Sequence, residues 1–171
     1  HEAINGLSNF DWIIFTSTNA VDKFFASLTD KDMDSRNLSS CRICAIGGAT
    51  SERLLQQGIS ADLVPERFTS NADFDALNKA NEISGKRYLL PRADISEADL
   101  PARLKDAGAD VTEVTSYKTV LADPDPDVID ILKNKQADIV TFTSSSTARN
   151  FASLVSASLG DLPEGVEYVS I

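Results

Sequence analysis

The chain has 171 residues, enough for one ordinary domain or two small ones. Sixteen basic residues against 26 acidic ones give a formal net charge of −10, which argues against non-specific nucleic-acid binding because that depends on Lys and Arg. No apolar run approaches the roughly 20 residues of a membrane-spanning helix, and residues 1–4 show no secretory signal, so a cytoplasmic protein is expected.

Short apolar runs alternate with amphipathic segments along the chain. Most runs are continuous and aliphatic or β-branched, as expected for strands covered on both faces. The predicted strands are Trp12–Thr16, Arg42–Ile46, Asp62–Val64, Arg87–Leu90, Val111–Val114, Ile139–Thr143 and Glu167–Ile171. The predicted helices are Asn19–Leu28, Thr50–Gln57, Ala72–Ala80, Glu97–Ala107, Pro126–Lys133 and Thr147–Leu154. This alternation predicts an α/β fold with a mostly parallel sheet and right-handed crossovers.

Cys41 and Cys44 are spaced as C-x-x-C. Redox pairs of this spacing lie at a helix N-terminus, whereas Cys41–Ile46 has the pattern of a buried strand. Positions three apart in a strand point to opposite faces, so we interpret both cysteines as small hydrophobic residues. The single histidine, His1, leaves a zinc site almost without ligands, and no metal is expected.

Two parts of the chain repeat one pattern. Asp11–Ser17 (DWIIFTS) is matched by Asp138–Ser144 (DIVTFTS), and each precedes a helix that contains Phe-Ala-Ser-Leu, at Phe25–Leu28 and Phe151–Leu154. The repeat indicates two similar α/β units. The second unit stops at its second strand, where unpaired backbone groups are costly. We therefore expect a fragment of a longer protein with an incomplete second domain.

The two units are expected to meet near Ser116–Pro126. Two prolines within Ala122–Pro126 prevent a helix or a central strand from continuing, and Val114–Val120 looks extended. We expect one α/β domain at 10–115, a linker strand at 116–122 and a partial second α/β domain at 123–171.

Small and hydroxyl-bearing residues follow the predicted strands, where parallel α/β sheets bind ligands. The segments are Thr16–Asn19, Gly47–Thr50, Phe68–Asn71 and Thr143–Ser146. A helix N-terminus offers unpaired N–H donors and about half a positive charge, so such loops bind carboxylates without lysine. Ser, Thr and Asn are also common helix caps, and any one loop alone fits that structural role better. The repeated Phe-Thr-Ser favours a function.

Arg92 directly follows the predicted strand Arg87–Leu90. Its guanidinium suits bidentate pairing with a substrate carboxylate. An ion pair with Asp94 or Glu97 is an equally good interpretation.

The chain has no P-loop, no G-x-G-x-x-G, no G-x-S-x-G, no histidine-based triad and no metal cluster. An enzyme of this sequence must work by folding a reactive substrate into shape, with one proton donor. Tyr117 suits that role, because a phenol is protonated at neutral pH and can donate to a leaving hydroxyl. The alternative is a half-buried strand tyrosine.

Taken in order, these segments resemble the uroporphyrinogen-III synthase family. The matching segments are Asp11–Val21, Ala45–Thr50, Asp62–Ser70, Gly85–Arg92, Gly108–Val111, Tyr117–Val120 and Val140–Ser146. They cover most of the chain, and their order and spacing are more specific than any one of them. The resemblance implies two flavodoxin-like, parallel-sheet α/β domains joined by a two-stranded linker, one domain being inserted and the other composed of both chain ends.

The resemblance also implies a reaction. The family consists of cofactor-free lyases that convert hydroxymethylbilane to uroporphyrinogen III with loss of water, in the biosynthesis of haem, sirohaem and cobalamin. Loss of hydroxide gives an azafulvene, which attacks the substituted carbon of the terminal pyrrole. The spiro intermediate then rearranges and leaves that ring inverted.

By resemblance, Tyr117 matches the family tyrosine that assists loss of the hydroxyl. The predicted substrate-binding residues are Thr16, Ser17, Asn19, Gly48, Thr50, Arg92, Thr143, Ser144 and Ser145. We expect a monomer that makes functional contact with hydroxymethylbilane synthase and, from its charge and its lack of long apolar runs, binds neither nucleic acid nor membranes.

The competing hypothesis is a non-catalytic, flavodoxin-like module that holds a small anion at the same helix N-termini. The lack of any acid, base or nucleophile besides Tyr117 favours this module. The ordered family segments count against it.

Overall fold

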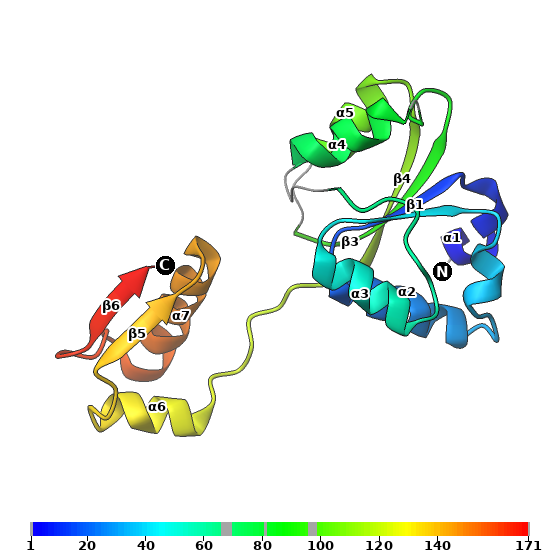
Figure 1. Cartoon of the computed structure of the whole chain (residues 1–171). Coiled ribbons are helices and arrows are strands. Elements are labelled where there is room, and N and C mark those ends of the chain that lie inside the picture. The colour runs from blue at the N-terminus through cyan, green and yellow to red at the C-terminus, as the bar shows by residue number, and fades with distance from the viewer. Residues whose placement is uncertain (1, 66–69, 81, 96–98, 171) are drawn as a thin grey trace. The chain divides into compact units, whose positions relative to one another are not determined.

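The computed structural model describes residues 2–65, 70–80, 82–95 and 99–170. It divides the chain into two compact units, residues 1–119 and residues 120–171. Both units are built of helices and parallel strands (Figure 1), which confirms the predicted α/β class and parallel sheet. No helix in the described ranges is long and apolar enough to cross a membrane.

The first unit contains a four-stranded parallel sheet. Its strands are β1 Trp12–Phe15, β2 Arg42–Ala45, β3 Arg87–Ala93 and β4 Asp110–Tyr117, in the order β2-β1-β3-β4. The predicted strand Asp62–Val64 is reduced to a single bridge from Leu63 to Cys44. The strand order changes direction between β1 and β3, and α/β sheets bind ligands outside the carboxyl ends of the strands at such a point.

Helices cover both faces of this sheet (Figure 1). On one face, called the α2 face, lie α1 Glu2–Asn5, α2 Thr18–Thr29, α3 Gly48–Gln56 and the 3-10 turns η1 Leu7–Asn9 and η2 Ser35–Leu38. On the other, called the α5 face, lie α4 Ser70–Lys79 and α5 Asp99–Asp106. The sequence interpretation missed α1 and both 3-10 turns.

Alternate residues of the strands divide the core between the two faces. All four residues of β1 are buried; Ile13 and Phe15 pack on the α2 face, and Trp12 and Ile14 on the α5 face. The prediction of strands covered on both sides is therefore confirmed for β1. The cysteines follow the same rule: Cys41 packs against the α2-face core and Cys44 lies within the α5-face core, and neither forms a disulfide.

The strand β3 continues three residues beyond its predicted end, Leu90, through Pro91 and Arg92 to Ala93. Proline interrupts a strand where a ladder partner needs its N–H. The Arg87 carbonyl accepts from the Asp11 backbone N–H ahead of β1, so Arg87, Leu89 and Pro91 direct their backbone groups towards β1. Pairing of β1 with β3 ends at Ile13 and Leu89, so Pro91 removes no ladder bond.

The second unit has two parallel strands, β5 Ile139–Phe142 and β6 Glu167–Ser170, with α6 Pro126–Lys133 and α7 Ser145–Leu159. Its buried residues are Leu132, Phe142 and Val155. The Phe142 ring contacts Tyr168 and Phe151, with ring centroids 6.3 and 5.4 Å away. Aromatic packing therefore joins the strand pair to α7.

Helix ends differ from prediction in one consistent way. The helices α2, α3 and α7 begin one or two residues earlier than expected, because Ser17, Gly47 and Ser144 are the N-caps. The helix α7 also extends five residues beyond Leu154 to Leu159 and ends at Gly160. The polar repeat Ser156–Ser158 weakens the apolar pattern there without breaking the helix.

Candidate active site

The carboxyl ends of the four parallel strands lie at one edge of the first sheet. Predicted site residues come to this edge from separate parts of the chain: Thr16 and Ser17 follow β1, Arg92 lies near the end of β3, and Tyr117 ends β4. Asn19 and Thr50 lie in the first turns of α2 and α3, and Gly48 begins α3. Thr143, Ser144 and Ser145 belong to the second unit, where they follow β5.

Tyr117 and Ser17 are in direct contact. The Tyr117 Oη and Ser17 Oγ atoms are 3.0 Å apart, although the residues are 100 positions apart in sequence. Both side chains are half-buried. The contact joins the end of β4 to the start of α2, beside the point where the strand order changes direction. The structure therefore brings the predicted proton donor together with one predicted binding residue.

An extra residue in β4 determines which way Tyr117 faces. Arg92 pairs with Thr115 and Ala93 pairs with Tyr117, so Ser116 has no counterpart in β3. Val114 and Tyr117 both pack on the α2-face core, although residues three apart in a regular strand point to opposite faces. Such irregularities re-aim side chains next to active sites. In an unbroken register, Tyr117 would face away from Ser17.

Ser17 is also the N-cap of α2. With φ −160° and ψ 156°, its backbone is extended, and its Oγ accepts from the Ala20 N–H at 3.2 Å. One Oγ therefore contacts both the N-terminal N–H group of a 12-residue helix and the Tyr117 phenol.

The repeated segment has the same cap in the second unit. Ser144 has φ −160° and ψ 156°, and its Oγ accepts from the Thr147 N–H at 3.2 Å. Its remaining hydroxyl contacts are local, to Ser146 at 3.0 Å and Thr147 at 2.7 Å. Thr143, Ser144 and Ser145 are exposed. The backbone repeat is close, but Ser144 has hydroxyl neighbours where Ser17 has a tyrosine.

The loop after β2 presents backbone rather than side chains. Gly47, the N-cap of α3, has φ 95°, a left-handed conformation that favours glycine. Gly48 is exposed, and a Cβ added there would meet nothing within 4 Å. Thr50 is only 4 % exposed, whereas Asn19 is exposed. At this loop the N-terminus of α3, rather than the Thr50 hydroxyl, is open to a ligand.

Arg92 has a protein carboxylate as its partner. It is 8 % exposed, and its Nη1 lies 2.8 Å from Glu113 Oε2. The Lys105 Nζ binds the other Glu113 oxygen at 3.0 Å. Partial burial acts to raise the Glu113 pKa, but the hydrogen bonds from Lys105 and Arg92 outweigh it and hold this pKa below its usual value. The sequence interpretation offered Asp94 or Glu97 as ion-pair partners; Glu97 lies outside the described residues, and Glu113 was not foreseen.

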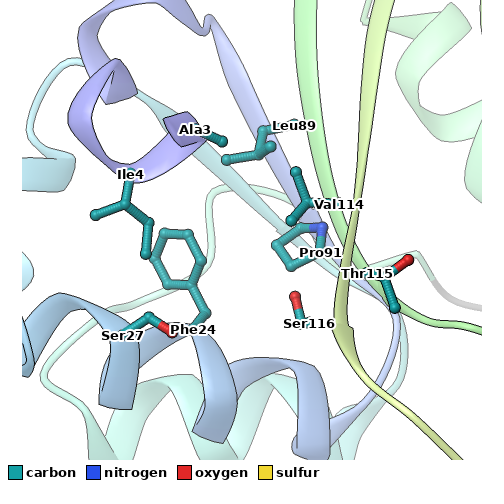
Figure 2. Close-up of a pocket in the computed structure, with 9 residues that line it drawn as sticks. All are labelled: Ala3, Ile4, Phe24, Ser27, Leu89, Pro91, Val114, Thr115 and Ser116. Carbon is teal, nitrogen blue, oxygen red and sulfur yellow. The ribbon is translucent and has the colours of Figure 1, made fainter. Parts of the chain in front are cut away.

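A pocket of about 140 Å³ lies on the α2 face beside this edge. Figure 2 shows apolar side chains around it and the Ser116 hydroxyl turned towards it. Its lining residues are Ala3, Ile4, Phe24, Ser27, Leu89, Pro91, Val114, Thr115 and Ser116. The sequence interpretation missed this pocket, because one wall comes from α1 and another from the extra residue in β4. Phe68 and Thr69, also proposed at a helix start, lie outside the described residues.

Comparison with known proteins gives consistent results. The family model described as "Uroporphyrinogen-III synthase HemD" matches residues 1–171. The uroporphyrinogen-III synthase of Synechococcus elongatus is 30 % identical over 161 residues, which are 93 % of this chain and 60 % of that protein. The Chlorobaculum parvum uroporphyrinogen-III synthase is 30 % identical over 172 residues, 96 % of this chain and 67 % of that protein. The crystal structure of uroporphyrinogen-III synthetase from Helicobacter pylori superposes with a TM-score of 0.65 at 21 % identity, over 95 % of this chain and 68 % of that one.

Proposed function

The chain belongs to the uroporphyrinogen-III synthase family, and from that premise we propose that it cyclises hydroxymethylbilane to uroporphyrinogen III. The chain spans 60 % of the length of its Synechococcus relative and 67 % of its Chlorobaculum relative. The family match along the whole chain carries the proposal. The Tyr117–Ser17 contact at the edge of the sheet gives it a chemical centre.

Tyr117 is the proton donor in this proposal. The substrate's hydroxymethyl C–O bond breaks, and the phenol proton moves to the leaving oxygen to form water. The resulting azafulvene carbon forms a bond to the substituted carbon of the terminal pyrrole, giving the spiro intermediate. Rearrangement inverts that ring, and the proton lost as the ring regains aromaticity restores the phenol. Water is the only group lost overall.

Helix N-termini bind the substrate carboxylates. Thr16, Ser17 and Asn19 surround the start of α2, Gly48 and Thr50 the start of α3, and Thr143, Ser144 and Ser145 the start of α7. Their backbone N–H groups are donors for anions, which suits a chain with a net charge of −10. Arg92 belongs to this set by its position, but its burial and its bond to Glu113 make it the member that the geometry supports least.

We also propose the family's domain plan for this chain. The boundary between the two compact units, between Thr119 and Val120, lies within the predicted linker 116–122. Residues 118–125 form neither a helix nor a strand. The plan places an inserted α/β domain at 10–115 and part of a composite domain at 123–171. A cytoplasmic monomer in functional contact with hydroxymethylbilane synthase completes the proposal. In this proposal, as in the family, no cofactor takes part.

The test is an isomer analysis. The complete protein is incubated with freshly generated hydroxymethylbilane, and the type I and type III products are separated. A dominant type III product is expected, because the bound pose favours spiro attack over direct closure. If only type I accumulates, at the rate of uncatalysed closure, the synthase proposal fails and an anion-binding module takes its place.

A further inference from the structure

The Ser17 hydroxyl connects the N-terminus of α2 to the Tyr117 phenol. Its Oγ lies 3.2 Å from the Ala20 nitrogen and 3.0 Å from Tyr117 Oη. A serine hydroxyl has one hydrogen to donate and two lone pairs to accept with. The Ala20 N–H occupies one lone pair, so the Ser17 hydrogen remains to be placed.

The role of the Tyr117 O–H hydrogen determines which atom accepts the Ser17 hydrogen. If Tyr117 donates its hydrogen to the leaving hydroxyl of the substrate, the same hydrogen is not available to Ser17. The 3.0 Å contact is then a bond in which the Ser17 O–H donates and the Tyr117 oxygen accepts. The opposite direction would point the phenol hydrogen away from the substrate.

We propose that Ser17 is a positioning residue that acts through Tyr117, rather than a ligand for a substrate carboxylate. Its O–H holds the phenol oxygen, directs the phenol hydrogen towards the leaving group and stabilises the negative charge that proton transfer leaves on that oxygen. The inference deepens the proposed function and rests on it. It changes the role that the sequence resemblance implied for Ser17.

The position of Ser17 at the helix start strengthens this effect. The positive end of the α2 macrodipole lies at Ser17, and the Ala20 N–H polarises the Ser17 hydroxyl. Ser17 and Tyr117 are both half-buried, so water screens the interaction between their hydroxyl groups less than at an exposed site. The chain of donors therefore runs from the Ala20 N–H through Ser17 to Tyr117.

The repeat supplies an internal comparison. Ser144 has the same backbone conformation and the same cap bond, but its hydroxyl contacts Ser146 and Thr147 within its own helix turn. Capping alone therefore does not bring a tyrosine to the serine. At Ser17 the contact requires the extra residue Ser116, which turns Tyr117 onto the α2 face.

A double-mutant cycle separates the two roles of Ser17. Ser17→Ala is expected to lower kcat for type III formation about 10-fold with little change in KM, and to cause no further loss in a Tyr117→Phe background. A carboxylate ligand would instead raise KM by the same factor in both backgrounds, and that result would overturn the inference. Ser17→Gly removes the hydroxyl but keeps most of the cap, so it should match Ser17→Ala, whereas Ser17→Thr should restore the rate.

A second measurement does not depend on activity. In ¹³Cζ-tyrosine NMR of the unligated protein each tyrosine gives its own signal, and Tyr117→Phe and the matching Tyr88→Phe and Tyr168→Phe variants assign the signals of this chain's three tyrosines. Ser17→Ala should move the Tyr117 signal and leave those of Tyr88 and Tyr168 in place. Asp125→Ala, which removes the cap of α6, should move none of them. An unmoved Tyr117 signal contradicts the hydrogen bond whether or not the protein makes type III product. A moved signal in a protein that makes no type III product instead overturns the proposed function, and the catalytic role of Ser17 with it.

Discussion

Arg92 and Glu113 form an ion pair across the neighbouring strands β3 and β4, with Nη1 and Oε2 2.8 Å apart. The Arg92 side chain is 9 % exposed and that of Glu113 is 39 % exposed. Lys105 of α5 binds the second Glu113 oxygen, so one carboxylate joins two strands and a helix. The strand end next to Tyr117 is therefore held by a charged contact.

Replacing Glu113 by Ala should destabilise the first unit by about 1–3 kcal/mol, because a buried guanidinium loses a charge-assisted partner. Urea unfolding of the variant and the wild type measures the difference. Glu52→Ala is the matched control, since Glu52 is exposed on α3, and it should stay within about 0.5 kcal/mol. Equal midpoints for Glu113→Ala and the wild type would show that the pair contributes nothing.

The Glu113 carboxylate should also make the free energy of unfolding depend on pH in the acidic range. Burial acts to raise the Glu113 pKa, but the bonds from Lys105 and Arg92 lower it below the reference value of 4.5. The stabilisation by the ionised Glu113 carboxylate is then complete above about pH 4.5 and disappears as the pH falls through the folded-state pKa. The difference in unfolding free energy between the wild type and Glu113→Gln should therefore shrink as the pH is lowered from 6 to about 3. A difference that is constant over this range would contradict the ion pair.

Tyr88 should give the opposite dependence, at high pH. Burial, followed by the nearby Glu82 carboxylate, raises the Tyr88 pKa well above the usual value for a phenol, and its hydroxyl donates to the Glu82 carbonyl. Stabilisation by the neutral phenol is complete below the unfolded-state pKa and is lost as the pH rises through the folded-state pKa. In an alkaline absorbance titration, Tyr88→Phe should remove an ionisation that occurs well above the usual pKa of a phenol. Loss of an ionisation at the usual pKa of a phenol would contradict the burial argument.

Ser144 should behave differently from Ser17. Its proposed role is to bind a substrate carboxylate at the start of α7, so Ser144→Ala should raise KM several-fold and leave kcat nearly unchanged. The lost cap should also cost the second unit about 1 kcal/mol. Steady-state kinetics and thermal unfolding check the two effects separately. A fall in kcat at constant KM would give Ser144 the kind of role proposed for Ser17.

The sequence was most informative where the chemistry is local. The buried run of β1 and the alternating faces of Cys41 and Cys44 follow from strand geometry and side-chain type alone. The repeated Phe-Thr-Ser predicted two similar helix starts, although Ser17 and Ser144 cap them one or two residues earlier than expected.

Features that depend on strand register were not predictable in the same way. Pro91 is tolerated in β3 because the pairing of β1 with β3 ends at Ile13 and Leu89, which no local pattern reveals. Alternation alone places Tyr117 and Val114 on opposite faces, whereas the extra residue Ser116 puts both on one face. The ion pair of Arg92 with Glu113 likewise depends on the pairing of β3 with β4.

In the proposed mechanism, Tyr117 donates the proton that releases the substrate hydroxyl. The most direct test is the rate of type III formation by Tyr117→Phe in the complete protein, with Tyr168→Phe as the matched control. Tyr117→Phe should lower kcat by roughly 100-fold or less at similar KM, within the range of general-acid assistance, and Tyr168→Phe should cause no change. An unchanged kcat for Tyr117→Phe would contradict the claim and remove Tyr117 from the mechanism.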